Sequence, residues 1–146
     1  MQKYSASAVI HQPPEVVFAF LSDMTNNPKW EPGILEMHKV SPGPISVGTQ
    51  FSEVRKFMGR RMKTLYEVTA YDPPHQFAVR SAAGPMQLEA SYTCATAPEG
   101  TKVTDSVAFE LRGIMSVLRP LFGKMVQSQM QSTLSRLRQV LDQPAD

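Results

Sequence analysis

Residues 101–141 decide the fold class, and they read TKVTDSVAFELRGIMSVLRPLFGKMVQSQMQSTLSRLRQVL. Over residues 101–111 apolar side chains alternate with polar ones, which predicts a β-strand with one buried face. After Gly113 the apolar side chains recur at spacings of three to five up to Leu141, which predicts a long amphipathic helix. Pro120 interrupts this pattern only near its start. A helix of nearly thirty residues is about 40 Å long, enough to cross a whole sheet.

The sequence upstream of this stretch predicts the sheet itself. Residues 3–11 alternate loosely as a first strand, which Pro13-Pro14 ends, and Pro14 suits the start of a short helix that runs to Leu21. Trp30 lies in a second short turn or helix. From residue 34 the period is two, with turn signals at residues 41–44, 59–60, 72–75, 83–85 and 98–100. The predicted order is a strand, two short helices, six strands in a meander and the long helix.

Two of the turns predict a hairpin register. Taking Gly59-Arg60 as the two central residues places opposite each other Phe57 and Met62, Arg55 and Thr64, Glu53 and Tyr66, and Phe51 and Val68. A tight turn at Ala83-Gly84 places opposite each other Val79 and Leu88, and Phe77 and Ala90. Both registers gather aromatic and apolar side chains on one face, which is therefore the predicted inner face.

An antiparallel sheet of this kind cannot cover its own apolar face, so the long helix is expected to lie across it. Strands of this length twist strongly, and the sheet must curve around the helix. The predicted fold class is therefore α+β. It consists of a curved antiparallel sheet of about seven strands wrapped around a long C-terminal helix, with two short helices after the first strand.

Composition limits the kind of protein. The chain has 146 residues, which predicts a single domain over residues 1–146, and 42% hydrophobic with 19% charged residues excludes a disordered or coiled-coil protein. The net charge of +2 does not indicate a nucleic-acid partner. One cysteine, Cys94, excludes an internal disulfide framework and any Cys-rich metal site. No apolar run is long enough for a transmembrane segment, and the N-terminus lacks a signal-peptide core, so a cytoplasmic location is expected.

Short motifs along the whole chain are similar to those of one superfamily. They are residues 8–18 (AVIHQPPEVVF), 21–23 (LSD) with 27–30 (NPKW), 47–51 (VGTQF), 66–68 (YEV) with 72–74 (DPP), and 100–103 (GTKV). With this order of elements, the chain resembles the START and polyketide cyclase/dehydrase (SRPBCC) superfamily, which also contains the birch-pollen-allergen-like proteins. The resemblance implies the helix-grip fold.

The resemblance also implies a cavity between the sheet and the long helix. In that superfamily the cavity commonly takes a lipid, a polyketide, a sterol or another bulky apolar compound. Some members are cyclases or dehydratases, and many only bind or carry a ligand. No catalytic residue set is shared among them, so the resemblance implies no catalytic position here, and the catalytic residues stay unknown.

Four polar residues occupy inward positions of the predicted strands: Glu53, Arg55, Tyr66 and Asp105. Burying an ion is costly unless it is paired. Glu53 and Arg55 are neighbours on one face and could pair, and Asp105 could also reach Arg55. Two interpretations stay open. These residues form a structural salt bridge or a strand end that reaches water, or they are polar anchors at one end of an apolar pocket.

Apolar and aromatic side chains on the same faces complete the predicted ligand cavity. They are Phe57, Leu88, Tyr92, Phe109, Phe122 and Met125. Met suits either irregular core packing or a compliant pocket wall. Tyr92 either forms a hydrogen bond inside the cavity or only reaches its rim. Trp30 is expected to fill the space beside the short helices rather than to stack on a ligand.

Other reactive residues favour structural interpretations. His11, His38 and His75 lack ligand spacing, so neither a metal nor a cofactor is predicted. His75 is expected to be exposed, and His38 to form a solvated pair with Glu36. Cys94 is expected to be inert within the sheet. The basic residues near the first hairpin tip are expected to be solvated and not to bind nucleic acid; they are Lys56, Arg60, Arg61 and Lys63.

Three functions are compatible with this sequence. The first is binding or transport of a bulky hydrophobic small molecule, anchored by Arg55, Glu53 and Tyr66. The second is an enzyme of the cyclase or dehydratase kind, with Asp105 or Glu53 as base and Tyr66 or Arg55 stabilising an enolate. The third is an interaction protein that uses its hairpin or its helix, since the sequence allows either a monomer or a homodimer.

Overall fold

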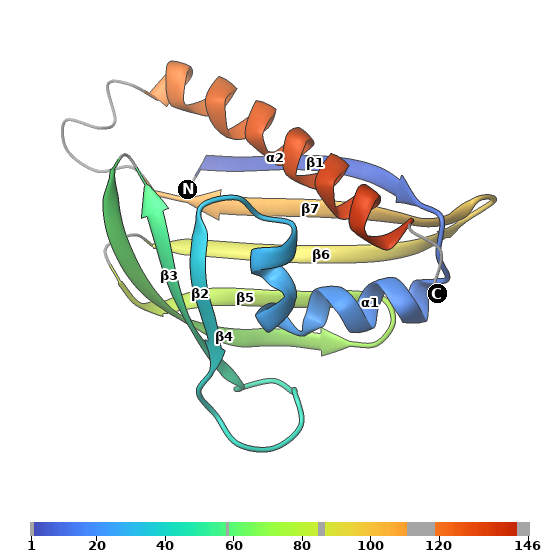
Figure 1. Cartoon of the computed structure of the whole chain (residues 1–146), viewed down its shortest axis with the longest axis horizontal. Coiled ribbons are helices and arrows are strands. Elements are labelled where there is room, and N and C mark those ends of the chain that lie inside the picture. The colour runs from blue at the N-terminus through green and yellow to red at the C-terminus, as the bar shows by residue number, and fades with distance from the viewer. Residues whose placement is uncertain (1, 58, 85–86, 111–118, 143–146) are drawn as a thin grey trace.

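A seven-stranded antiparallel sheet with a long helix lying across one face forms the part of the chain that the structure describes (Figure 1). This structure is a computed structural model, and it describes residues 2–57, 59–84, 87–110 and 119–142. The order of elements confirms the α+β prediction. The elements are β1 (Gln2–Ile10), α1 (Pro14–Ser22), the 3-10 helix η1 (Met24–Lys29), β2 (Ile34–Lys39), β3 (Gln50–Phe57), β4 (Arg60–Asp72), β5 (Gln76–Ala83), β6 (Leu88–Ala97), β7 (Gly100–Phe109) and α2 (Arg119–Leu141).

The strands β2 to β7 follow one another as a meander, and β1 returns to pair with β7. The resulting order is β1-β7-β6-β5-β4-β3-β2. Figure 1 shows β2 and β3 turned far away from the direction of β1, β7 and β6, so the sheet curves as predicted. The helices α1 and η1 lie on the same side of the sheet as α2 and cover its other end. One concave face is therefore enclosed by all three helices.

The core lies between this concave face and the helices. Ile10 and Val103 from the sheet are fully buried, as are Leu134 and Leu137 from α2. The predicted role of Trp30 is confirmed, since it is 1% exposed directly after η1 and its ring meets Tyr92 edge-on at 5.9 Å. Burial of such large apolar side chains supplies most of the free energy that holds the helices on the sheet.

Both predicted hairpin registers were wrong by two residues. In the first hairpin Phe57 pairs with Arg60 and Glu53 pairs with Thr64, so the turn comes one residue earlier than predicted. In the second hairpin Val79 pairs with Ala90, with β5 ending at Ala83 and β6 beginning at Leu88. A slip of two residues leaves every side chain on its original face. The predicted inner face was therefore correct.

The helix α2 also protects the free edge of the sheet. The Gln127 side-chain amide donates to the Ser5 carbonyl at 2.6 Å, and that of Gln131 donates to the Ser7 carbonyl at 3.3 Å. Residues four apart on a helix lie one above the other, and alternate carbonyls of a strand point the same way. The two glutamines thus satisfy edge acceptors of β1. The predicted extensions of the last strand to Leu111 and of the helix toward Gly113 lie outside the described residues.

Candidate ligand-binding cavity

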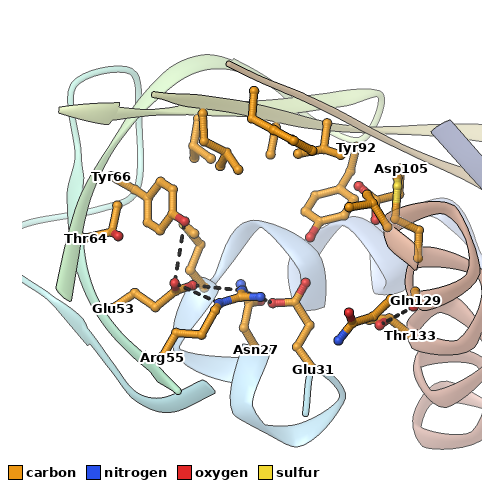
Figure 2. Close-up of a pocket in the computed structure, with 18 of the residues that line it drawn as sticks. Asn27, Glu31, Glu53, Arg55, Thr64, Tyr66, Tyr92, Asp105, Gln129 and Thr133 are labelled. Atoms are coloured by element: carbon orange, nitrogen blue, oxygen red, sulfur yellow. Dashed lines mark hydrogen bonds and ion pairs between the residues drawn. The ribbon is translucent and has the colours of Figure 1, made fainter. Parts of the chain in front are cut away.

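A cavity of about 250 Å³ lies between the concave face of the sheet and the three helices. Figure 2 shows polar side chains at its two ends and a row of apolar side chains along the sheet between them. Seven of the ten residues predicted from the sequence line this cavity: Glu53, Arg55, Tyr66, Leu88, Tyr92, Asp105 and Phe109. Side chains alternate between the two faces of a strand, so these inward residues of different strands share the concave face of the sheet.

The prediction for α2 was less accurate. Met125 is 45% exposed and does not line the cavity. The helix instead turns Val126, Met130 and Thr133 toward it, at a spacing of four and three residues. A register error of one residue on a helix rotates a side chain by about 100°. The side chains of Phe57 and Phe122 lie outside what the structure describes.

An ionic cluster forms one end of the cavity. The Arg55 guanidinium donates to both carboxylate oxygens of Glu53, at 3.1 and 3.2 Å, and the Tyr66 hydroxyl donates to Oε1 of Glu53 at 3.5 Å. Glu53 is only 2% exposed, so this bidentate geometry is what makes its burial tolerable. The predicted pairing of Glu53 with Arg55 is confirmed.

The second partner of Arg55 is a residue that sequence reasoning missed. Nη2 of Arg55 lies 3.5 Å from Oε2 of Glu31, in the loop between η1 and β2. The predicted alternative, a contact from Asp105 to Arg55, is not formed, because three strands separate β7 from β3 in the sheet. Only the position of Glu31 between the buried Trp30 and Pro32 could have indicated an inward side chain, since the loop has no periodicity.

Asp105 and Tyr92 form the other polar end of the cavity. They are directly opposite each other on β7 and β6, and each is 8% exposed. Figure 2 shows the Tyr92 hydroxyl, the Asp105 carboxyl group and the Glu31 carboxyl group around the same space. Among the described residues, the Asp105 carboxyl group has no hydrogen-bond or ion-pair partner. The Oδ1 atom of Asn27, also in the cavity wall, is likewise buried without a partner there.

Burial changes the acidity of these groups. It raises the pKa of Asp105 from 3.8 to about 7, and the nearby Glu31 carboxyl group adds to this. Burial also raises the pKa of Glu31 to about 7, although Arg55 opposes the change. Burial lowers the pKa of Arg55, but Glu31 and Glu53 together hold it above its ordinary value. At neutral pH the carboxyl groups of Glu31 and Asp105 are therefore partly protonated, while Arg55 stays positively charged.

The remaining reactive side chains lie away from the cavity. His75 is exposed, and His38 forms an exposed pair with Glu36 at 3.7 Å, as predicted. Cys94 is buried, and burial raises the pKa of its thiol to about 11, which agrees with an inert thiol. In the ranges that the structure describes, no three His, Cys, Asp or Glu side chains are arranged to hold a metal ion. No helix in those ranges is long and apolar enough to cross a membrane.

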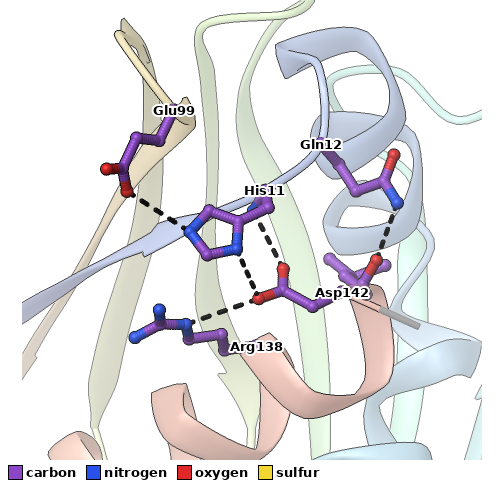
Figure 3. A network of polar contacts seen from close by, with 6 residues as sticks. His11, Gln12, Glu99, Arg138 and Asp142 are labelled. Carbon is purple, nitrogen blue, oxygen red and sulfur yellow. Dashed lines mark hydrogen bonds and ion pairs between the residues drawn. The ribbon is translucent and has the colours of Figure 1, made fainter. Parts of the chain in front are cut away.

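His11 links the end of α2 to the connection between β1 and α1 instead of forming a site. Figure 3 shows its ring between Asp142 and Glu99, with Nδ1 3.1 Å from Asp142 and Nε2 3.4 Å from Glu99. Its backbone N–H donates to the same Asp142 carboxylate at 2.8 Å, and Arg138 contacts that carboxylate at 3.4 Å. These contacts attach the end of α2 to the end of β1.

A second hollow of about 700 Å³ runs over β1, β5, β6 and β7. Its wall carries the exposed charged side chains of Lys3, Arg80 and Glu89. An apolar ligand gains little by lying against such a wall, because the neighbouring charges stay hydrated. The cavity beneath the helices is therefore the better candidate site.

Solved structures with the same fold are known from several sources. The protein TTHA0849 from Thermus thermophilus superposes with a TM-score of 0.82 at 22% identity, over 96% of this chain and 97% of that one. A START superfamily protein from Mycobacterium smegmatis gives 0.72 at 16% identity, over 96% and 94%. The di-domain ARO/CYC BexL from the BE-7585A biosynthetic pathway gives 0.76 at 16% identity, over 99% of this chain and 51% of that chain. At these identities the similarity establishes the helix-grip fold.

Comparison with curated protein sequences gives no match. The family model described as "Polyketide cyclase / dehydrase and lipid transport" matches residues 1–142, nearly the whole chain. The resemblance predicted from the short motifs is thereby confirmed. The chain belongs to the polyketide cyclase/dehydrase and lipid transport family.

Proposed function

We propose that this protein binds a bulky, mostly apolar small molecule in the cavity between the sheet and α2. The observation that carries the proposal is the cavity itself, a space of about 250 Å³ with apolar side chains along the sheet and polar groups at its two ends and on the side of the short helices. Small-molecule sites generally combine such a wall with a few placed polar groups. Membership of a family described by polyketide and lipid chemistry supports the same class of ligand.

The polar groups are suited to orienting such a ligand. Arg55, Glu53 and Tyr66 hold one another in a fixed geometry at one end of the cavity. A preorganised cluster loses little conformational entropy when a ligand binds. The apolar wall between the two ends then supplies affinity through the burial of ligand surface.

Native mass spectrometry of the purified protein tests this function. We expect a mass above that of the bare chain, which returns to the bare mass on denaturation, with the released compound recovered by solvent extraction. Protein that is purified empty should bind the neutral apolar dye N-phenylnaphthylamine with an increase in fluorescence. A bare mass in both spectra together with no dye binding would show that the proposal is wrong.

A second candidate function is supported by Asp105. Its raised pKa, its burial in the cavity and its position opposite Tyr92 suit a general base in an apolar site. The ionised Asp105 would take a proton from a carbon next to a ligand carbonyl, and the C–H electron pair would form an enolate. The Tyr92 hydroxyl would donate a hydrogen bond to the enolate oxygen. Such proton transfer is a step that cyclases and dehydratases need.

Hydrogen exchange in heavy water separates this candidate from pure binding. We expect the protein to accelerate deuterium uptake at the carbon next to the carbonyl of an aromatic ketone such as tetralone, as followed by NMR. Asp105→Asn should abolish the acceleration, and the exposed Asp72→Asn should preserve it. No acceleration by the unaltered protein, under conditions where the ketone binds, would leave binding as the function.

A further inference from the structure

We infer that the bound molecule carries a protonated amine, whose ammonium group lies between the carboxyl groups of Asp105 and Glu31. This inference rests on the proposed binding function and specifies the chemical class of its ligand.

The described wall of the cavity contains more anionic groups than cationic ones. Glu31, Glu53 and Asp105 bring three carboxyl groups, against the half-buried guanidinium of Arg55. Lys56 also borders the cavity, but its side chain is exposed at the rim. The groups that α2 contributes are Gln129 and Thr133, which are uncharged. When Glu31 and Asp105 are ionised, a bound cation would balance the excess negative charge of this wall.

Arg55 is not available as an anchor for an anionic ligand. Its guanidinium is held by both oxygens of Glu53 and by Glu31, at 3.1 to 3.5 Å. A ligand carboxylate would have to displace one of these buried carboxylates from its partner, or lie beside them as a further negative charge. Either arrangement costs free energy, because like charges repel strongly where water is excluded.

Asp105 supplies the unused partner for a cation. Its carboxyl group is buried in the cavity wall and has no hydrogen-bond or ion-pair partner among the described residues. Glu31 and Asp105 both line this cavity, and the Glu31 carboxyl group adds to the raised pKa of Asp105. Figure 2 shows both directed into that space, with the Tyr92 ring beside them.

Two further features favour an ammonium group at this position. The unpartnered Oδ1 of Asn27 is another acceptor in the same wall, and Asn27 is 3% exposed. The Tyr92 ring lines the cavity directly opposite Asp105, so an aromatic surface borders the carboxyl groups. Ammonium groups prefer surroundings of carboxylates, carbonyl oxygens and aromatic faces.

Three probes of matched shape test the inference: naphthylmethylamine, naphthylmethanol and naphthoate. Their affinities follow from displacement of N-phenylnaphthylamine or from calorimetry at about pH 8.5, where the cavity carboxyl groups ionise most fully. We expect the amine to bind at least about tenfold more tightly than the alcohol, and naphthoate to bind most weakly, since one charged hydrogen bond is worth about that factor.

The pH dependence identifies the groups responsible. The titratable or charged groups facing the shared space are Glu31, Glu53, Arg55, Tyr66, Tyr92 and Asp105, with Lys56 at the rim. Between about pH 5.5 and about pH 8.5 the carboxyl groups lose their protons, so the affinity for the amine should rise while that for the alcohol changes little. Asp105→Asn should remove most of this rise and reduce the preference for the amine by about tenfold.

The exposed Asp72→Asn serves as the matched control and should retain the preference of the unaltered protein. Glu31→Gln provides a second variant if Asp105→Asn does not fold. Equal binding of all three probes, or tightest binding of naphthoate, would overturn the inference while leaving the binding function intact. An amine preference unchanged in both variants would also overturn it. Binding of none of the probes, and none of the dye, would overturn the binding function as well.

Discussion

At the scale of one residue, the buried carboxyl group of Asp105 lowers the free energy of unfolding when it is ionised, and the same burial gives the cavity a group with a raised pKa. Its pKa is 3.8 when exposed and about 7 in the folded protein, so folding favours its protonated form. Between these two pH values the folded state holds the proton more firmly than the unfolded state. The contribution of Asp105 to the free energy of unfolding therefore falls as pH rises through this window, by about 1.4 kcal/mol per pH unit.

Asp105→Asn should accordingly stabilise the protein at high pH. The neutral amide has the same shape and avoids the desolvation cost of a buried carboxylate. We expect the gain in unfolding free energy to be a few kcal/mol at about pH 8 and close to zero below about pH 4, as measured by urea denaturation. The variant Asp72→Asn, at an exposed position, should show no such trend. A pH-independent difference between Asp105→Asn and the unaltered protein would contradict this account.

Arg55 has the opposite role, since its removal leaves buried charges without a partner. Arg55→Met keeps much of the apolar stem but isolates the carboxylates of Glu53 and Glu31. We expect a loss of about 3 kcal/mol in the free energy of unfolding at neutral pH, with partial recovery in acid as the carboxyl groups become protonated. Arg80→Met removes an exposed pair with Glu67 and should cost less than about 1 kcal/mol. Equal losses in the two variants would show that the cluster around Arg55 contributes no more to the free energy of unfolding than an exposed ion pair does.

At this scale the sequence identified residues on strands better than residues in loops. Glu53, Arg55 and Asp105 stand at every-second-residue positions among apolar neighbours, so their inward direction followed from periodicity alone. Glu31 lies in a loop, where no period links sequence position to direction. Its approach to Arg55 depends on how η1 and β2 pack together, which only the three-dimensional structure contains.

At the scale of elements, strand faces were predictable while turn positions and helix phase were not. Faces repeat every two residues, so the two-residue errors at Phe57 and Val79 did not move any side chain across the sheet. On a helix, an error of one residue rotates the side chain by about 100°. Met125 was assigned to the cavity, whereas its neighbour Val126 lines it. The apolar stripe of α2 is wide enough that its pattern allows either Met125 or Val126 to face the cavity.

The edge contacts of α2 give a prediction at the scale of elements. The double substitution Gln127→Ala and Gln131→Ala removes both side-chain donors to the β1 carbonyls. We expect a loss of about 1 to 2 kcal/mol in the free energy of unfolding and faster amide exchange in β1. Gln139→Ala on the same helix is exposed and makes no side-chain hydrogen bond to described residues, so it should be neutral or slightly stabilising. Unchanged amide exchange in β1 would mean that the glutamines do not secure this edge.

At the scale of the whole molecule, the fold keeps a space open that packing could have closed. Helix-grip proteins set a curved sheet against one long helix, and here the gap holds about 250 Å³. Sequence periodicity predicted the sheet, the helix and the enclosed face, but not that the face would stay unfilled. That outcome depends on the small side chain at Ala90 and on the rotation of α2, and neither changes the pattern of apolar residues.

Filling this space should separate stability from function. Ala90 lines the cavity on β6, opposite Val79 on one side and Val107 on the other, so Ala90→Phe directs a ring into the open space. We expect the free energy of unfolding to stay within about 1 kcal/mol or to rise, because the ring gains contacts in place of a void. Affinity for N-phenylnaphthylamine should fall at least about tenfold, since the ring occupies volume that the dye needs.

Ala95→Phe adds the same ring on the exposed face of the same strand and should leave dye affinity unchanged. Retained binding in Ala90→Phe would place the binding site outside this cavity, with the hollow over β1, β5, β6 and β7 as the next surface to test.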